Sequence, residues 1–332
     1  MKTRTRVGLI AAAATAGLGA ISYAGQRAVA ARIRRNPDDG APRALEAPLY
    51  VSHRLASHDA GTINVVEAGE GPPIVLSHGV TLSVRTWFYQ LEQLPRDGFR
   101  VLAFDHRGHG DSVAGDSGHS LENLGEDLRS VLVGLDVRDA VLVGHSMGGV
   151  AVQQFVTTFP DIARERVRGI VLLSTLARAP FAGHTARFER RLDGLVSRLP
   201  DSTALWNARN LGFVLTRFGF GKDPKPSHVE LVRRMMADCS DETRRLAPYA
   251  LVGLDLSDAI AKIDLPTLVI GGTADLLTPA AEAARIARLI PDARLELIAG
   301  GGHMLMLERT DDVNRLITDF AREVQSNAPA SS

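Results

Sequence analysis

The stretch from Ala140 to Ala151, AVLVGHSMGGVA, constrains the fold more than any other part of the chain. A β-branched run, Val141 to Val143, stops at Gly144, and Ser146 follows with a glycine pair behind it. The segment from Val150 to Phe159 then has helical character. Gly-x-Ser-x-Gly between a strand and a helix forms a nucleophile elbow, a strained turn that holds a serine hydroxyl clear of a sheet. The stretch therefore predicts a strand–helix unit that presents Ser146 as a nucleophile.

Short apolar runs alternate with amphipathic segments on both sides of this elbow. Strands are predicted at 49–55, 62–67, 73–77, 100–104, 141–143, 169–174, 266–272 and 294–298. Helices of the same pattern are predicted at 87–94, 121–135, 150–159, 279–290 and 311–324. Such alternation indicates an α/β fold with a mostly parallel sheet covered by helices on both faces, preceded here by an antiparallel pair.

The alternation breaks between residues 176 and 262, where helical stretches replace the strands. They are predicted at 185–199, 203–215, 228–237 and 241–255, and the segment concentrates Phe, Trp and Met. We expect a helical cap inserted before the strand that carries the catalytic acid, with part of its apolar side chains lining a pocket and the rest forming its own core. The expected division is 1–47 for an N-terminal segment and linker, 48–175 with 263–324 for the core, 176–262 for the cap and 325–332 for a disordered tail.

A serine hydroxyl becomes a good nucleophile only when a base takes its proton, and a histidine usually does so. His303 follows Gly300-Gly301-Gly302 directly after a predicted strand, in a loop where the parallel strands end. We expect His303 to be the base. The histidines at 78, 106, 109 and 145 lie in other loops of the same edge and are expected to be structural or to line the pocket.

The histidine needs a carboxylate to orient it. Asp275 follows a predicted strand and a glycine turn, which gives the chain order Ser, Asp, His. Asp255 and Asp258 are rivals by position but lie in the helical insertion, so we expect Asp275 to be the acid. The developing oxyanion needs fixed donors, and the backbone N–H groups of Met147 and of Val80, in the loop after the strand at 73–77, are the candidates.

These motifs together resemble the α/β-hydrolase superfamily, specifically its capped branch of carboxylesterases, lipases and non-haem haloperoxidase-like proteins. The matching segments, between about residue 50 and residue 322, are HG at 78–79, DHRGHGDS at 105–112, GHSMGG at 144–149, GTAD at 272–275 and GH at 302–303. The resemblance implies an eight-stranded, mostly parallel sheet and an acyl-enzyme mechanism at its carboxyl edge. It also implies that Asp105 and Arg107 shape the loop beside the oxyanion hole and take no part in the chemistry.

Composition excludes several other classes. The 332 residues carry 38 basic and 38 acidic side chains, and this balance argues against nucleic acid as a partner. The single cysteine, Cys239, excludes an intrachain disulfide and a cysteine metal cluster, and we expect it to be a buried or neutral thiol. The motifs indicate neither a metal nor an organic cofactor, and they leave the oligomeric state open.

The amino terminus is the compositional outlier. Basic residues at 2, 4 and 6 precede an uncharged run at 7–24, and further arginines follow it. This pattern fits a secretory signal peptide or a marginal membrane span, and an Ala-rich helix packed on the domain is the alternative. We expect membrane association through residues 7–24 and a location in a membrane or the cell envelope rather than the cytoplasm.

The residues predict an enzyme that hydrolyses carboxylic esters of small molecules with a hydrophobic acyl or alcohol part. Serine at the elbow argues against the epoxide hydrolases and haloalkane dehalogenases, which need aspartate there. Thioesterase, acyltransferase, carbon–carbon hydrolase and cofactor-free haloperoxidase or perhydrolase activities use similar constellations and stay open. A ligand receptor on an intact hydrolase fold is the alternative from another class.

Overall fold

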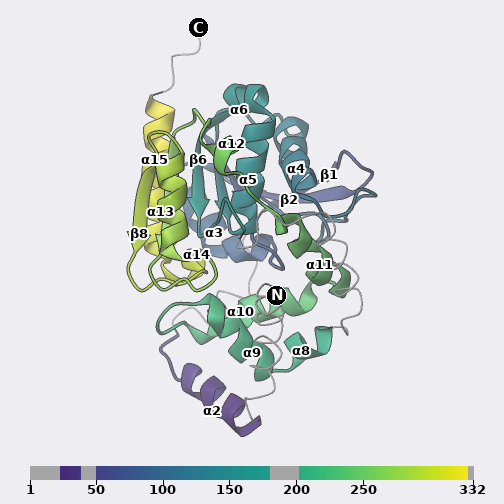
Figure 1. Ribbon diagram of the computed structural model, residues 1–332, viewed down its shortest axis with the longest axis vertical. Helices are drawn as coiled ribbons and strands as arrows, with labels where there is room; N and C mark the ends of the chain where they lie inside the picture. The colour runs from purple at the N-terminus through teal and green to yellow at the C-terminus, as the bar shows by residue number, and fades with distance from the viewer. Residues whose placement is uncertain (1–22, 39–49, 180–201, 328–332) are drawn as a thin grey trace, which may run out of the picture.

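A computed structural model gives the fold and describes residues 23–38, 50–179 and 202–327 (Figure 1). Eight strands form one sheet in the order β1-β2-β4-β3-β5-β6-β7-β8. They are β1 (Val51–Ala56), β2 (Thr62–Ala68), β3 (Pro73–Ser77), β4 (Arg100–Phe104), β5 (Ala140–His145), β6 (Val167–Leu173), β7 (Thr267–Gly272) and β8 (Arg294–Ile298). Strands β3 to β8 run parallel, whereas β2 is antiparallel to β1 and β4. The predicted fold class is confirmed.

Helices cover both faces of the sheet. The short helix η1 (Val84–Trp87) and the helices α3 (Phe88–Arg96), α14 (Leu305–Glu308) and α15 (Thr310–Ser326) pack on one face. The other face carries α4 (Leu121–Gly134), α5 (Met147–Thr158), α6 (Pro160–Arg166), α12 (Ser257–Ile260) and α13 (Ala280–Leu289). Side chains alternate across each strand, so Val141 and Val143 enter the first core while Leu142 enters the second. Burial on both faces explains why strands β3 to β7 are mainly apolar, whereas the edge strand β8 is largely exposed.

Between β6 and β7 the described residues fold into a helical layer below the sheet in Figure 1. It comprises α8 (Thr203–Asn207), α9 (Leu211–Thr216), η2 (Arg217–Gly219), α10 (Pro226–Asp238), α11 (Asp241–Leu246) and η3 (Ala247–Leu251), and we call residues 202–251 the cap. The helix predicted at 203–215 is divided at 208–210. The one predicted at 241–255 ends as α11 at Leu246, and η3 begins at Ala247 and contains Pro248, which has no N–H to donate. The helix predicted at 185–199 lies outside the described residues.

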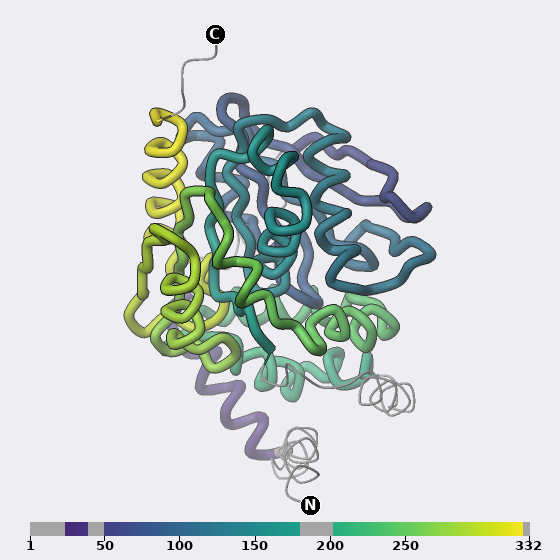
Figure 2. The backbone as a smooth tube through the Cα atoms, turned by 45° about the horizontal axis from the view of Figure 1, so that its top comes forward, coloured from purple at the N-terminus to yellow at the C-terminus, as the bar shows by residue number. Residues whose placement is uncertain are grey.

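The N-terminal helix α2 (Tyr23–Ile33) packs on the cap, against α9 (Figures 1 and 2). It buries Ala30 and Ile33 in the core that it shares with the cap, and Arg34 lies over the Phe213 ring, with its guanidinium carbon 4.8 Å from the ring centroid. Asp38 then accepts hydrogen bonds of 2.7 Å from both the backbone N–H and the hydroxyl of Ser227, in the first turn of α10.

This packing corrects the predicted localisation. We expected residues 7–24 to place the protein in a membrane or the cell envelope, but among the described residues no helix is long and apolar enough to cross a bilayer. The described part of the N-terminal segment is a short helix with arginines in it, and it buries Ala30 and Ile33 in the core that it shares with the cap. The residues from 7 to 22 lie outside the described part of the chain.

Candidate active site

Ser146 occupies the turn between β5 and α5, with a backbone φ of 53° and ψ of −119°. Residues other than glycine rarely adopt a positive φ, and this conformation costs on the order of 1–3 kcal/mol. A Cβ on Gly148 would lie 2.1 Å from the Ser77 carbonyl oxygen, so only glycine allows the start of α5 to approach β3 so closely. The Ser146 N–H donates to Leu173 O (3.1 Å) and its carbonyl accepts from Thr175 Oγ1 (2.6 Å), which ties the strained residue to β6 and the loop after it.

Asp275 and His303, predicted from separate strand ends, lie side by side. His303 Nδ1 is 3.0 Å from Asp275 Oδ2, and the two side chains are almost completely buried. The Thr278 hydroxyl donates to Asp275 Oδ2 (2.7 Å), and the N–H groups of Leu277 and Thr278 donate to Oδ1 (2.8 and 2.9 Å). Burial alone would raise the pKa of Asp275, but the hydrogen bonds from His303 and Thr278 hold that pKa below its ordinary value. Asp275 is therefore a carboxylate at neutral pH.

The loop that carries His303 is fixed from two sides. On the sheet side, His145 Nε2 donates to the His303 carbonyl oxygen (3.0 Å), and the two rings lie 4.7 Å apart between centroids. On the cap side, the His303 N–H donates to the Gly219 carbonyl oxygen (3.0 Å). Burial lowers the pKa of His145 well below its ordinary value, so this imidazole is neutral. We expected His145 to be structural or to line the pocket, and its contacts are structural, because it supports the loop that carries His303.

The loop after β3 passes directly beside the elbow. A Cβ built on Gly79 would lie 3.0 Å from His145 Nδ1 and 3.1 Å from Ser146 Cβ, so a side chain there would be crowded by the elbow. Val80 is half-buried and packs against the same small apolar cluster that contains Met147. The structure thus places the side chains of Val80 and Met147, the residues of the two candidate oxyanion donors, in one cluster at the start of α5.

His78 anchors this loop. The His106 N–H donates to His78 Nε2 (3.0 Å), so Nε2 carries no proton, and His78 Nδ1 donates to the Gly79 carbonyl oxygen (2.7 Å). Burial lowers the pKa of His78 to about 4, which keeps it neutral. Asp105, whose carboxylate accepts from the Val84 N–H (2.8 Å), holds the far end of the loop.

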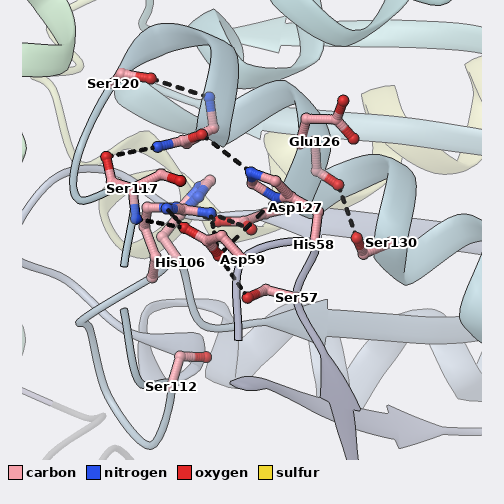
Figure 3. Close-up of polar contacts among 12 residues, drawn as sticks. Ser57, His58, Asp59, His106, Ser112, Ser117, Ser120, Glu126, Asp127 and Ser130 are labelled. Carbon is pink, nitrogen blue, oxygen red and sulfur yellow. Dashed lines mark hydrogen bonds and ion pairs between the residues drawn. The ribbon is translucent and has the colours of Figure 1, made fainter. Parts of the chain in front are cut away.

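Arg107 lies at the centre of a buried ion-pair network with Asp59 and Asp127. The guanidinium, only 1% exposed, bonds both carboxylate oxygens of Asp127 at 2.7 Å and approaches Asp59 at 3.0 Å. Figure 3 shows Asp59 and Asp127 close together, with Ser57 donating to Asp59. Despite its burial, the pKa of Asp59 is held far below its ordinary value by Arg107. The network joins the β1–β2 turn to α4, and its contacts are structural.

Two further observations concern metal binding and thiol chemistry. Among the described residues, no three His, Cys, Asp or Glu side chains are grouped so as to hold a metal ion. Cys239 is buried, and burial raises the pKa of its thiol to about 11, so the prediction of a buried, neutral thiol is confirmed.

Sequence reasoning missed several residues that support this site. Thr278 follows Asp275 by three positions, a spacing typical of side-chain-stabilised turns, and could have been suspected from it. Gly219 and Glu308 also contact the loop of His303. Gly219 is distant from His303 in sequence, and Glu308 lies in a turn that the sequence analysis did not recognise, so no local pattern indicates either contact.

Comparison with known proteins identifies the class. Residues 72–310 match the family model of the alpha/beta hydrolase fold, and the chain belongs to that family of enzymes. It is 30% identical over 276 residues to a non-heme haloperoxidase of Rhodococcus erythropolis, covering 80% of this chain and 98% of the relative. A bifunctional esterase/perhydrolase of Acinetobacter calcoaceticus is 28% identical over 265 residues, covering 76% and 92%. A thermophilic esterase from Thermogutta terrifontis superposes with a TM-score of 0.69 at 25% identity, covering 82% and 99%.

Proposed function

We propose that the protein is a serine esterase that cleaves carboxylic esters through an acyl-enzyme. The Ser146 hydroxyl attacks the ester carbonyl while His303 takes its proton. His303 then returns that proton to the departing alcohol, and the acyl group remains on Ser146. Water, deprotonated by His303, attacks the acyl-enzyme and releases the carboxylic acid.

The observation that carries the proposal is the buried hydrogen bond between Asp275 and His303 at the same sheet edge as the strained Ser146. When His303 takes the serine proton it becomes a cation, and an adjacent buried carboxylate stabilises that cation. The lowered pKa of Asp275 keeps it charged for this purpose. Asp275 also fixes the tautomer of His303, because Nδ1–H must donate to it and Nε2 is left to act as the base.

The backbone N–H groups of Val80 and Met147 are the proposed oxyanion donors. Met147 is the first residue of α5, where N–H groups have no partner within the helix and the helix dipole favours negative charge. Loss of one such donor typically costs about 10²–10³-fold in kcat. Asp105 and His78 contribute by holding the loop that contains Val80.

We further propose a hydrophobic acyl chain or lipophilic alcohol for the substrate, with the pocket completed by the helical insertion at 176–262. The apolar composition of this insertion and the word esterase in the names of two relatives support the assignment. The core would then comprise 48–175 with 263–324, as expected from the sequence.

The test is hydrolysis of p-nitrophenyl esters of increasing chain length by the wild type, Ser146→Ala and Ser130→Ala. Ser130 lies on α4, away from the elbow, and its hydroxyl donates to the Glu126 carbonyl, so its variant is the matched control. We expect multiple turnovers with a burst, loss of at least about 10³-fold in Ser146→Ala and no loss in Ser130→Ala. Equal rates in the wild type and Ser146→Ala would refute the serine assignment, and a single stoichiometric acylation would favour a receptor.

A second candidate is perhydrolysis, which the names of the haloperoxidase and esterase/perhydrolase relatives favour. Hydrogen peroxide would replace water as the attacking group, so the acyl-enzyme would yield a peracid and free Ser146. Ester turnover in the presence of peroxide, coupled to oxidation of bromide by the peracid, measures this activity. Bromide oxidation that persists in Ser146→Ala would exclude the shared acyl-enzyme.

A further inference from the structure

A short segment of the cap lies directly along the loop of the proposed catalytic histidine. We call residues 219–222 the strap and residues 300–304 the histidine loop. The N–H groups of His303 and Met304 both donate to the Gly219 carbonyl oxygen (3.0 and 3.1 Å), and the Lys222 N–H donates to the Gly300 carbonyl oxygen (3.3 Å). The two backbones are thus paired at both ends.

The carboxylate of Glu308 occupies the middle of this contact. Its Oε2 accepts from the Gly221 N–H of the strap (2.6 Å) and from the Gly302 N–H of the histidine loop (3.2 Å). Its Oε1 accepts from the Met304 N–H (3.1 Å). One half-buried side chain therefore binds both segments through charge-assisted hydrogen bonds, which are about twice as strong as neutral ones.

The approach of the two backbones leaves no room for another side chain. A Cβ on Gly302 would lie 2.1 Å from the Gly221 nitrogen, and a Cβ on Gly221 would lie 2.2 Å from the Gly300 oxygen. The histidine loop therefore cannot keep this geometry if the strap shifts towards it, and it loses hydrogen bonds if the strap moves away. Burial raises the pKa of Glu308, although its backbone donors and Arg309 oppose that rise.

We propose that Glu308 is a positioning residue that couples the seating of the cap strap to the orientation of His303. The inference rests on the proposed role of His303 as the base. Glu308 touches no reacting atom; it acts by holding the N–H groups on either side of His303, so that the imidazole stays aligned between Asp275 and Ser146. A carboxylate is needed here because all three partners of the Glu308 oxygens are backbone N–H donors. The side-chain amide of glutamine would place its own N–H group against one of these donors.

The test uses the full chain and a fluorophosphonate, which reacts with an activated serine whatever the natural substrate. The Ser146 oxygen bonds to phosphorus, fluoride leaves, and the serine proton passes to His303. We expect Glu308→Gln to be labelled about 10- to 100-fold more slowly than wild type, since small misplacements of a catalytic group have effects of that size. For an ester substrate we expect kcat to fall with KM nearly unchanged, and the acidic limb of the pH–rate profile to move.

Leu132→Ala is the matched control for stability, because Leu132 is fully buried in α4 and faces the core on the other side of the sheet. It should unfold at a lower temperature yet be labelled at the wild-type rate. Amide hydrogen exchange in residues 300–304 should accelerate in Glu308→Gln and stay unchanged in Leu132→Ala.

The outcomes are distinguishable. If wild type is not labelled, the proposed triad fails. If wild type is labelled and Glu308→Gln reacts at the same rate with the same pH profile, the role of Glu308 is overturned. If Glu308→Gln does not fold, Gly221→Ala displaces the strap while keeping the carboxylate, and wild-type labelling of that variant would equally overturn the inference.

Discussion

Replacing Ser146 by glycine should stabilise the protein while abolishing its activity. The backbone φ of 53° at Ser146 costs on the order of 1–3 kcal/mol for a residue with a Cβ, and glycine relieves it. Alanine keeps the Cβ and hence the strain, so Ser146→Ala isolates the loss of the hydroxyl. Glycine adds freedom to the unfolded chain, which costs about 0.4–1 kcal/mol. The difference leaves Ser146→Gly more stable than Ser146→Ala by about 1 kcal/mol.

Thermal unfolding followed by calorimetry measures this difference, which corresponds to about 2 °C in Tm for a chain of this size. The matched control is Ser130 in the interior of α4, where the backbone is helical. There, Ser130→Gly should be less stable than Ser130→Ala by about 1 kcal/mol, the reverse order. A Ser146→Gly variant no more stable than Ser146→Ala, with the control behaving as expected, would refute the claim that the elbow stores strain.

Three other substitutions test charged side chains that bond within the fold. The folded-state pKa of Asp275 lies below its unfolded value, so its stabilisation is present above the unfolded value and lost as the pH falls through the folded one. Asp275→Asn should therefore lower the urea midpoint most at pH ~7 and progressively less as the pH falls through the folded-state pKa. A pH-independent loss would contradict this. Arg107→Gln leaves Asp59 and Asp127 buried without their cation, so urea unfolding should show a loss of about 3–5 kcal/mol in the free energy of unfolding. A loss below about 1 kcal/mol would be incompatible with the network. Asp38→Ala removes the carboxylate that accepts from the Ser227 N–H at the start of α10. The same assay should show a loss of about 1 kcal/mol in the free energy of unfolding, and this loss should shrink at high salt. A salt-independent loss would exclude an electrostatic contribution.

Most of the sheet was predictable because strands β3 to β7 are buried on two faces and so appear as apolar runs between turns. The strands at 73–77, 100–104 and 294–298 were predicted with the bounds that the structure has. Ser146, Asp275 and His303 could be chosen because each follows such a run with glycine beside it, and the structure has Asp275 bonded to His303. Their catalytic roles remain predictions.

The contacts that surround these residues were not predictable from local pattern. Glu308 bonds Gly221, 87 positions away in sequence, and Asp38 bonds Ser227, 189 positions away, so local hydrophobic periodicity cannot indicate either contact. The N-terminal segment misled for a related reason, because composition alone does not distinguish a helix that meets lipid from one that, like the described α2, packs on a protein surface.

The docking of α2 on the cap has a consequence for the order in which a newly made chain can fold. Asp38 emerges from the ribosome long before Ser227, its partner 189 positions later. At a synthesis rate of about 5–20 residues per second, that interval is roughly 10–40 s. During that time Ala30 and Ile33 have no cap to cover them. The first described helix of the chain can therefore pack on the cap only after more than half of the polypeptide has been translated. Until then, its apolar residues Ala30 and Ile33 are exposed and available to chaperones.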